Sequence, residues 1–318
     1  MSRRTISYKT RNHIMNSFSS YEKFQQIREQ TESERQAANR PHEVLYFHKV
    51  DDPYSHLTLQ CVEKLISSYE ITLKFILVGE ENLETVHEPS LYNIYCLQDV
   101  NRIAPFYNID FQAHEYPAKE LVEKANSILT AAKSDDLIEI ANKVNSALWE
   151  GDIGTLDKLS STYFATKAEV KENLIQGNKI RDAKGYYFGS AFYYEKELYW
   201  GVDRLPYLEE RLAELGAKKA QEIQNICPLE LKAPIKFTSD KKVNLYYYPS
   251  LNSPYTFVST KRVRQMREDY PINLITKPVL PMLMRMMTIP GFKAKYIISD
   301  AAREGRRHNH EMKSIYSP

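Results

Sequence analysis

The chain has 318 residues, of which 42% are hydrophobic and 26% charged, so it holds enough apolar material for one large or two ordinary domains. The formal net charge of +2 provides no bulk field that would recruit nucleic acid or an anionic membrane. Basic residues concentrate in 1–40 and 285–313, which we interpret as solvated faces rather than as a nucleic-acid surface.

The three cysteines, Cys61, Cys96 and Cys227, are widely spaced and form no CxxC motif. This spacing argues against a dithiol redox centre, a disulfide scaffold and a zinc site, and we expect no metal. The glycine-rich signatures of dinucleotide and P-loop sites do not occur. We find no apolar run long enough for a signal peptide or a membrane span, so we expect a cytoplasmic protein.

Residues 1–40 read as a polar, helical N-terminal extension, and the first domain is expected over 41–216. It opens with an apolar strand at 44–47 and a polar turn that ends in Asp52-Pro53. Aspartate is a good N-cap and proline fits the first helical position, so a helix should begin there. Its apolar stripe makes Cys61 a core residue, and a second strand follows at 71–77, which completes a βαβ unit.

The segment at about 84–182 is predicted to be a helical insertion, with apolar spacing that is clearest at 119–133, 135–148 and 166–181. A hairpin is expected next, with strands at 191–195 and 198–200. Asp203 should cap a last helix that stops at Gly216. The domain then reads βαβ, helical insertion, ββα.

An internal repeat defines the rest of the chain. Residues 44–78 align without gaps on 245–279, at a constant offset of 201, with eight identical positions. The aligned segments share the order strand, Pro turn, helix, strand. We therefore predict a linker over 217–241 and an incomplete second copy over 242–318, which consists of βαβ plus helices.

An incomplete copy should leave an open sheet edge and an apolar face. We expect this half to pack on the first domain, to complete itself in a homodimer, or to belong to a longer protein with a further C-terminal half.

Three segments resemble the DsbA-like branch of the thioredoxin superfamily, and above all the 2-hydroxychromene-2-carboxylate isomerases and kappa-class glutathione transferases. They are the turns DDPYSHL (51–57) and NSPYTFV (252–258), the closing segment GYYFGSAFYYEKELYWGVDRLPYLE (185–209), and the stretch 278–307. The resemblance implies an α/β, thioredoxin-like fold with a partial second copy. It also implies glutathione as a cosubstrate.

In that family the residue before the turn proline is a cysteine in DsbA and a serine in the isomerases. The start of a helix favours an anion, so a serine there can donate a hydrogen bond to the thiolate of bound glutathione. This position is Ser253 in the second copy, which is our candidate catalytic residue, with Asn252 and Tyr255 shaping the turn. In the first copy it is Asp52, whose carboxylate would repel a thiolate, with Tyr54 behind it.

The resemblance assigns three further positions to the first copy. Ser190 stands where the family has a cis-proline that leaves backbone groups free for glutathione. Asp203 and Arg204 match the residues that hold the γ-glutamyl end of glutathione. The first copy thus retains part of a glutathione site and lacks its activating group.

Three functions remain open. The first is a glutathione-dependent isomerase or transferase that acts on a small hydrophobic, conjugated or aromatic compound. The second is a catalytically degenerate thioredoxin-like module that serves as a scaffold or small-molecule binder. The third is a DsbA-type oxidoreductase, which the absence of a CxxC motif makes chemically untenable.

Overall fold

The computed structural model describes residues 8–80, 84–132, 136–220, 224–228 and 239–315. Contacts divide the chain into two compact units. The first unit comprises residues 32–231, and the second combines residues 1–31 with 232–318.

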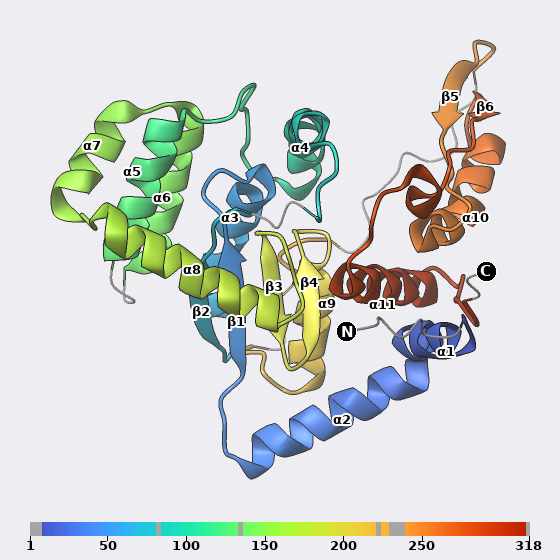
Figure 1. Ribbon diagram of the computed structural model, residues 1–318, viewed down its shortest axis with the longest axis horizontal. Helices are drawn as coiled ribbons and strands as arrows, with labels where there is room; N and C mark the ends of the chain where they lie inside the picture. Colours follow the sequence, from blue (N-terminus) through green and yellow to red (C-terminus); the bar gives the residue numbers. More distant parts are fainter. Residues whose placement is uncertain (1–7, 81–83, 133–135, 221–223, 229–238, 316–318) are drawn as a thin grey trace, which may run out of the picture. The chain divides into compact units, whose positions relative to one another are not determined.

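The first unit is built on a four-stranded sheet with the order β2-β1-β3-β4 (Figure 1). Its strands are β1 (Glu43–His48), β2 (Thr72–Leu77), β3 (Ala191–Tyr194) and β4 (Glu197–Trp200). The β1 and β2 strands are parallel and joined through α3 (Pro53–Ser68), whereas β3 pairs antiparallel with both β1 and β4. The predicted βαβ unit and closing hairpin are therefore confirmed.

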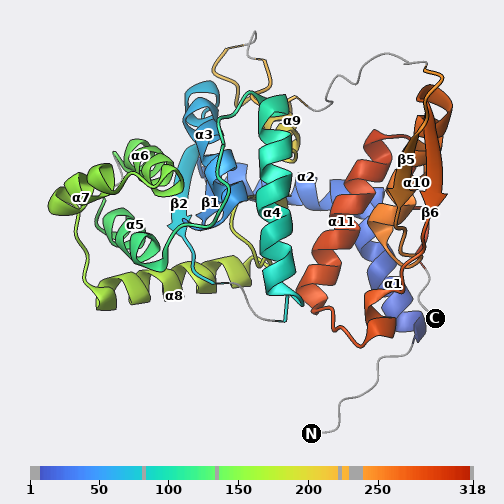
Figure 2. The same cartoon turned by 90° about the horizontal axis from the view of Figure 1, so that it is seen from above.

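Helices fill the predicted insertion. They are α4 (Pro89–Ile103), the 3₁₀ turn η1 (Ala104–Tyr107), α5 (Lys119–Ala131), α6 (Leu137–Glu150), α7 (Ile153–Thr162) and α8 (Lys167–Ala183). Helices α5 to α8 form a group on the β2 side of the sheet in both views (Figure 2). The expected ends at Lys133 and Asp135 lie outside the described residues.

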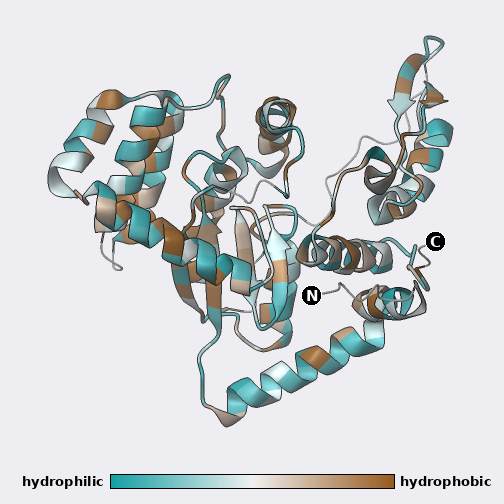
Figure 3. Cartoon of the chain, in the orientation of Figure 1, coloured by the Kyte–Doolittle hydropathy of each residue, from teal (hydrophilic) through white to brown (hydrophobic). Residues whose placement is uncertain are grey.

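One hydrophobic core holds the first unit together. On α3, Leu57, Cys61 and Leu65 are all buried, as their spacing predicts. They pack with residues of β1 and of the helical insertion, and β1 and β2 carry long hydrophobic stretches (Figure 3). Cys61 is thus a core residue.

The structure corrects one expectation about the end of the first unit. The last helix, α9 (Leu205–Glu214), has Arg204 and not Asp203 at its N-cap position, and the Arg204 side chain makes no capping hydrogen bond. Described residues within the predicted linker contact the first unit. The backbone N–H of Lys219 donates to Ser68 O, and Cys227 is fully buried.

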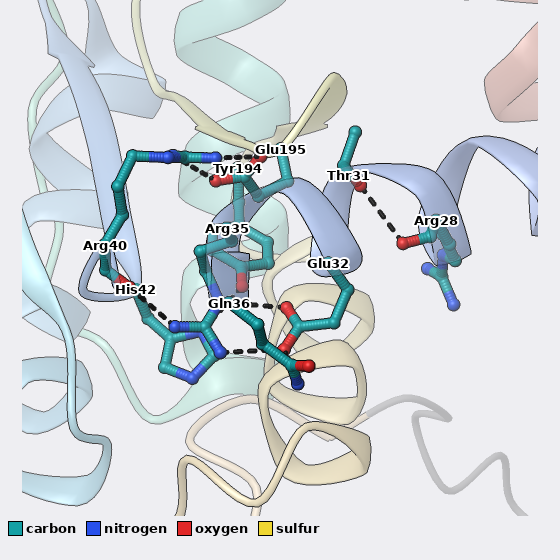
Figure 4. Close-up of polar contacts among 9 residues, drawn as sticks. All are labelled: Arg28, Thr31, Glu32, Arg35, Gln36, Arg40, His42, Tyr194 and Glu195. Carbon is teal, nitrogen blue, oxygen red and sulfur yellow. Dashed lines mark hydrogen bonds and ion pairs between the residues drawn. The ribbon is translucent and has the colours of Figure 1, made fainter. Parts of the chain in front are cut away.

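Helix α2 (Tyr21–Ala37) ends in a polar cluster that fixes it to the β3–β4 hairpin (Figure 4). The Arg35 guanidinium donates to Glu32 and to the carbonyl oxygen of Arg40. Arg40 in turn forms an ion pair of 2.8 Å with Glu195 in the hairpin turn. The C-terminal end of the predicted extension is therefore an integral part of the first unit.

The second unit contains β5 (Val243–Tyr247), α10 (Pro254–Asp269), β6 (Ile272–Thr276), the 3₁₀ turn η2 (Met282–Arg285) and α11 (Gly291–Arg307). The β5 and β6 strands pair in parallel, with α10 as their connection. Helix α1 (Tyr8–Ser19) packs against α11, and Asn16 exchanges hydrogen bonds with the backbone of Ile315 at 2.6 and 3.1 Å. The N-terminal segment therefore belongs to this unit, a long-range pairing that the sequence did not indicate.

Candidate functional site

The first turn ends at Asp52, whose side chain caps α3. The Asp52 carboxylate accepts hydrogen bonds from the backbone N–H of Tyr54 (3.3 Å), the backbone N–H of Ser55 (3.0 Å) and the Ser55 hydroxyl (2.7 Å). Pro53 follows at the first helical position, as predicted. The positive end of α3 is therefore already neutralised by a carboxylate that belongs to the chain itself.

A loop at residues 188–190 lies directly against this turn. A Cβ atom on Gly189 would come within 2.6 Å of the Ser55 hydroxyl and 2.9 Å of the Lys49 Cβ, so only glycine fits. Ser190 is fully buried in the left-handed region at φ +56°, and its hydroxyl donates to the carbonyl oxygen of Tyr54 at 2.9 Å. The residue that stands at the expected cis-proline position thus ties the loop to α3, and the described residues contain no cis peptide bond.

A cavity of about 280 Å³ opens at this turn. Its lining residues are Lys49, Asp51, Asp52, Pro53, Glu80, Val86, Pro89, Tyr92, Asn93, Cys96, Tyr116, Phe188 and Trp200. Phe188 stacks on Tyr92 with ring centres 5.7 Å apart, and on Trp200 at 5.4 Å. One wall of the cavity is therefore a stack of flat aromatic rings, which suits a flat, conjugated guest.

The charges around the cavity are mainly negative. Among the described lining residues, the acidic ones are Asp51, Asp52 and Glu80 and the basic one is Lys49, whose amino group lies 3.7 Å from the Asp51 carboxylate. Burial raises the pKa of the Cys96 thiol to about 12, so it stays protonated at neutral pH. The described lining residues are therefore unfavourable for an anion, and they include no thiolate.

Tyr54 lies behind the turn and is absent from the cavity wall. Its hydroxyl donates to Asp99 of α4 at 2.7 Å, and its ring packs edge-on against Trp200. Burial and this hydrogen bond hold the pKa of Tyr54 well above its usual value, so it remains a hydrogen-bond donor. Tyr54 therefore positions α4 and Trp200.

Asp203 and Arg204 form an ion pair with each other at 2.6 Å. Asp203 is exposed, and neither residue is among those that line the cavity. Among the described residues the structure brings Asp52 and the Ser190 loop together, and it leaves this pair apart from the cavity.

The second turn has the same construction with a different cap. The Ser253 hydroxyl accepts a hydrogen bond from the backbone N–H of Thr256 at 3.3 Å, and Pro254 begins α10. Asn252 is exposed next to it. Tyr255 donates to Asp300 of α11 at 2.8 Å, and that buried carboxylate also forms an ion pair with Arg303.

The contacts of the two turns recur at the offset of 201 positions. The bond from Tyr54 to Asp99 corresponds to that from Tyr255 to Asp300. The N–H of Lys49 donates to Ser55 Oγ as that of Ser250 donates to Thr256 Oγ1, at 3.3 and 3.1 Å. Helix α11 thus occupies the place of α4, and its residues Pro290, Tyr296, Asp300 and Arg303 are identical to Pro89, Tyr95, Asp99 and Arg102.

The predicted repeat ends at Val78 and Val279 and so leaves out this fourth element, although the same ungapped offset reveals it. The cavity wall of Tyr92, Phe188 and Trp200 was not predicted either. The aromatic run at 185–200 was visible, but nothing local showed that it faces the Asp52 turn.

No protein-family model matches this chain, and no curated protein sequence matches it. Six chains of solved structures match its structure. One is a 2-hydroxychromene-2-carboxylate isomerase, 18% identical with a TM-score of 0.38, covering 55% of this chain and 96% of that chain. Another, proposed to be a protein disulfide isomerase, comes from Nitrosomonas europaea. It is 14% identical with a TM-score of 0.43, and the covered shares are again 55% and 96%.

The element order of the first unit, βαβ then helices then ββα, with β3 antiparallel to β1, is that of the DsbA-like thioredoxin fold. The predicted fold class is therefore confirmed for this unit. Within the described residues, none of the helices has the length and apolar character needed to cross a bilayer. Those residues also contain no group of three or more His, Cys, Asp or Glu side chains placed to hold a metal ion.

Proposed function

We propose that the first unit is a catalytically degenerate thioredoxin-like module that binds a small aromatic or conjugated molecule carrying a positive charge. The observation that supports this most directly is the Asp52 carboxylate, which caps α3 and lines a cavity walled by stacked aromatic rings. A protonated amine near Asp51, Asp52 and Glu80 would be attracted, and the rings would pack on the conjugated part.

The same charge disfavours a thiolate. Two like charges about 4 Å apart repel by roughly 4 kcal/mol at the effective dielectric of a protein surface, which exceeds what a helix end contributes to anion binding. Glutathione should therefore bind the first turn poorly.

A matched pair of probes tests the proposal. Phenethylamine and 3-phenylpropionate have similar size and opposite charge, and we expect the amine to bind at least about tenfold more tightly in calorimetric titrations. Asp52→Asn keeps an N-cap and removes the charge, so it should abolish most of that preference, whereas the exposed control Asp203→Asn should preserve it. Equal binding of both probes by the wild-type chain would contradict the proposal.

A second candidate is a glutathione-dependent isomerase or transferase reaction at the second turn. Here the cap is a half-buried serine and not a carboxylate, and a hydroxyl that accepts one hydrogen bond still has its own proton to donate. In this proposal the two units are copies of one ancestral module. Ser253 stabilises the glutathione thiolate, Asn252 and Tyr255 shape the turn, and a small hydrophobic, conjugated substrate adds to the sulfur reversibly.

Titration with glutathione separates this candidate from the first. Ser253→Ala should weaken glutathione binding about tenfold, and Ser253→Asp, which copies the first turn, should weaken it further. Asn252→Ala serves as the neighbouring control that leaves the cap intact. The candidate fails if all three variants bind glutathione as the wild type does. An insulin-reduction assay should show no activity in any of them.

A further inference from the structure

The second unit leaves exposed the positions that the first unit buries. Four apolar residues of the first unit have apolar counterparts 201 positions later that face solvent. The exposed fractions are 7% for Leu45 against 48% for Tyr246, 0% for Phe47 against 57% for Tyr248, 1% for Val50 against 82% for Leu251, and 1% for Val78 against 39% for Val279. Tyr246 lies on β5, and Val279 is bridged to Ser250 beside Leu251, so we interpret these exposed apolar positions as a surface that binds a partner.

In the first unit, the edge of β1 that faces away from β2 is covered by a strand. In β1, the carbonyl oxygen of His48 points toward the β2 side, where it accepts from Val78 N–H. Because backbone groups alternate along a strand, those of Leu45 and Phe47 point toward the opposite edge. Leu45 and Phe47 accordingly stand opposite Tyr193 and Ala191 of the antiparallel strand β3. The occupant of this edge in the first unit is thus an antiparallel strand.

The same alternation identifies the free backbone groups of β5. Tyr247 O accepts from Lys277 N–H and Val243 N–H donates to Pro271 O, so these residues point toward β6. Asn244, Tyr246 and Tyr248 therefore present their N–H and C=O groups at the opposite edge, where the described residues supply no paired strand.

We propose that this edge binds a second copy of the same chain, so that two β5 strands pair antiparallel across a two-fold axis. The spacing of the outward groups fixes the register. Tyr246 lies opposite Tyr246 of the other copy, and Asn244 lies opposite Tyr248, so the three residues exchange hydrogen bonds symmetrically.

The sequence of the strand favours this self-pairing. Residues 243–248, VNLYYY, hold no charge and no proline, with Lys241 and Lys242 before them and Pro249 after them. Charged side chains and prolines are the usual means of keeping an edge strand monomeric, so their absence from this strand leaves the edge open for pairing. The Tyr246 pair adds an aromatic cross-strand contact. Lys277 lies over the Tyr246 ring at 4.9 Å, so pairing at Tyr246 brings the Lys277 side chains of the two copies near each other. Because salt screens the repulsion between these like charges, added salt should strengthen the dimer.

Cross-linking of the full chain tests both the dimer and its register. In an antiparallel hydrogen-bonded pair the two Cα atoms lie about 5.5 Å apart, which suits a disulfide. Under oxidation by copper phenanthroline, Tyr246→Cys should give a covalent dimer. Tyr247→Cys should not, because the backbone of Tyr247 is bonded on the β6 side and its side chain contacts α10. Tyr248→Cys should also stay uncross-linked, because its two copies would be separated by about 14 Å.

Sedimentation provides the second test. The wild type should show a monomer–dimer equilibrium at micromolar concentrations, and Tyr246→Lys combined with Tyr248→Lys should weaken it at least about tenfold. Leu91→Lys, at an apolar position on α4 that is even more exposed, is the control. Circular dichroism checks that each variant is folded. A wild-type chain that stays monomeric, or a dimer that the lysine pair leaves unchanged, would overturn the proposal.

Discussion

Replacing Gly177 with alanine should lower the free energy of unfolding of the first unit by about 3 kcal/mol. Gly177 lies in α8 where this helix crosses β2, and a Cβ atom there would come 1.9 Å from the carbonyl oxygen of Leu77. That oxygen belongs to the backbone of β2, which is paired with β1, so it cannot move aside as a flexible side chain could. The helix must shift off the sheet instead.

Gly154→Ala is the matched control, because Gly154 also lies in a helix, α7, and its nearest neighbour is a side-chain oxygen at 3.5 Å. Alanine favours helix more than glycine, so this variant should be unchanged or stabilised by up to about 1 kcal/mol. Urea unfolding followed by circular dichroism measures both. Equal shifts for the two variants would show that the close approach at Leu77 is not what requires glycine.

The parts of this structure that are specified locally could be predicted from the sequence. Asp52-Pro53 and Ser253-Pro254 begin helices where expected, because a cap and an N1 proline act within a single turn. The stripe of Leu57, Cys61 and Leu65 identified the buried face of α3, because residues four apart lie on the same side of a helix.

The cavity could not be predicted in this way, because its wall is assembled from distant segments. Tyr92 comes from α4, Phe188 from the loop before β3, and Trp200 from the end of β4. Each residue looks like an ordinary core aromatic in its own segment. Likewise, the pairing of α1 with α11 joins the two ends of the chain, and no local signal marks it.

Lowering the pH from 7.5 to 5 should destabilise the first unit, chiefly through two buried histidines. His48 is fully buried, with its Nε2 2.7 Å from Asn145 Nδ2, and His56 stacks on Trp149. Burial lowers the pKa of His48 to about 3 and that of His56 to about 4. Both are neutral in the folded chain but take up a proton in the unfolded chain below about pH 6.5. At pH 5 each histidine therefore lowers the free energy of unfolding by about 2 kcal/mol.

Glu209 opposes this loss. It is fully buried and accepts hydrogen bonds from Ile226 N–H at 3.0 Å and from the Tyr69 hydroxyl at 3.3 Å. Burial raises the pKa of Glu209 from its ordinary value of 4.5 to about 7. Between these two pH values the folded chain holds a proton on Glu209 that the unfolded chain has released. The resulting stabilisation is fully present below that lower value and is lost as the pH rises through 7, and it amounts to about 2 kcal/mol at pH 5.

The two effects predict different pH responses for the wild type and for Glu209→Gln, which keeps an oxygen to accept from Ile226 and cannot titrate. From pH 7.5 to 5 the wild type should lose about 2 kcal/mol of unfolding free energy and the variant about 4 kcal/mol, measured from urea midpoints at each pH. Tyr69→Phe removes a hydrogen bond to the same carboxylate without removing the carboxyl group, so it should retain the shallower response. Equal losses of unfolding free energy in the wild type and Glu209→Gln would contradict this prediction. They would mean that the Glu209 carboxyl ionises at the same pH in the folded and unfolded chains, despite its burial.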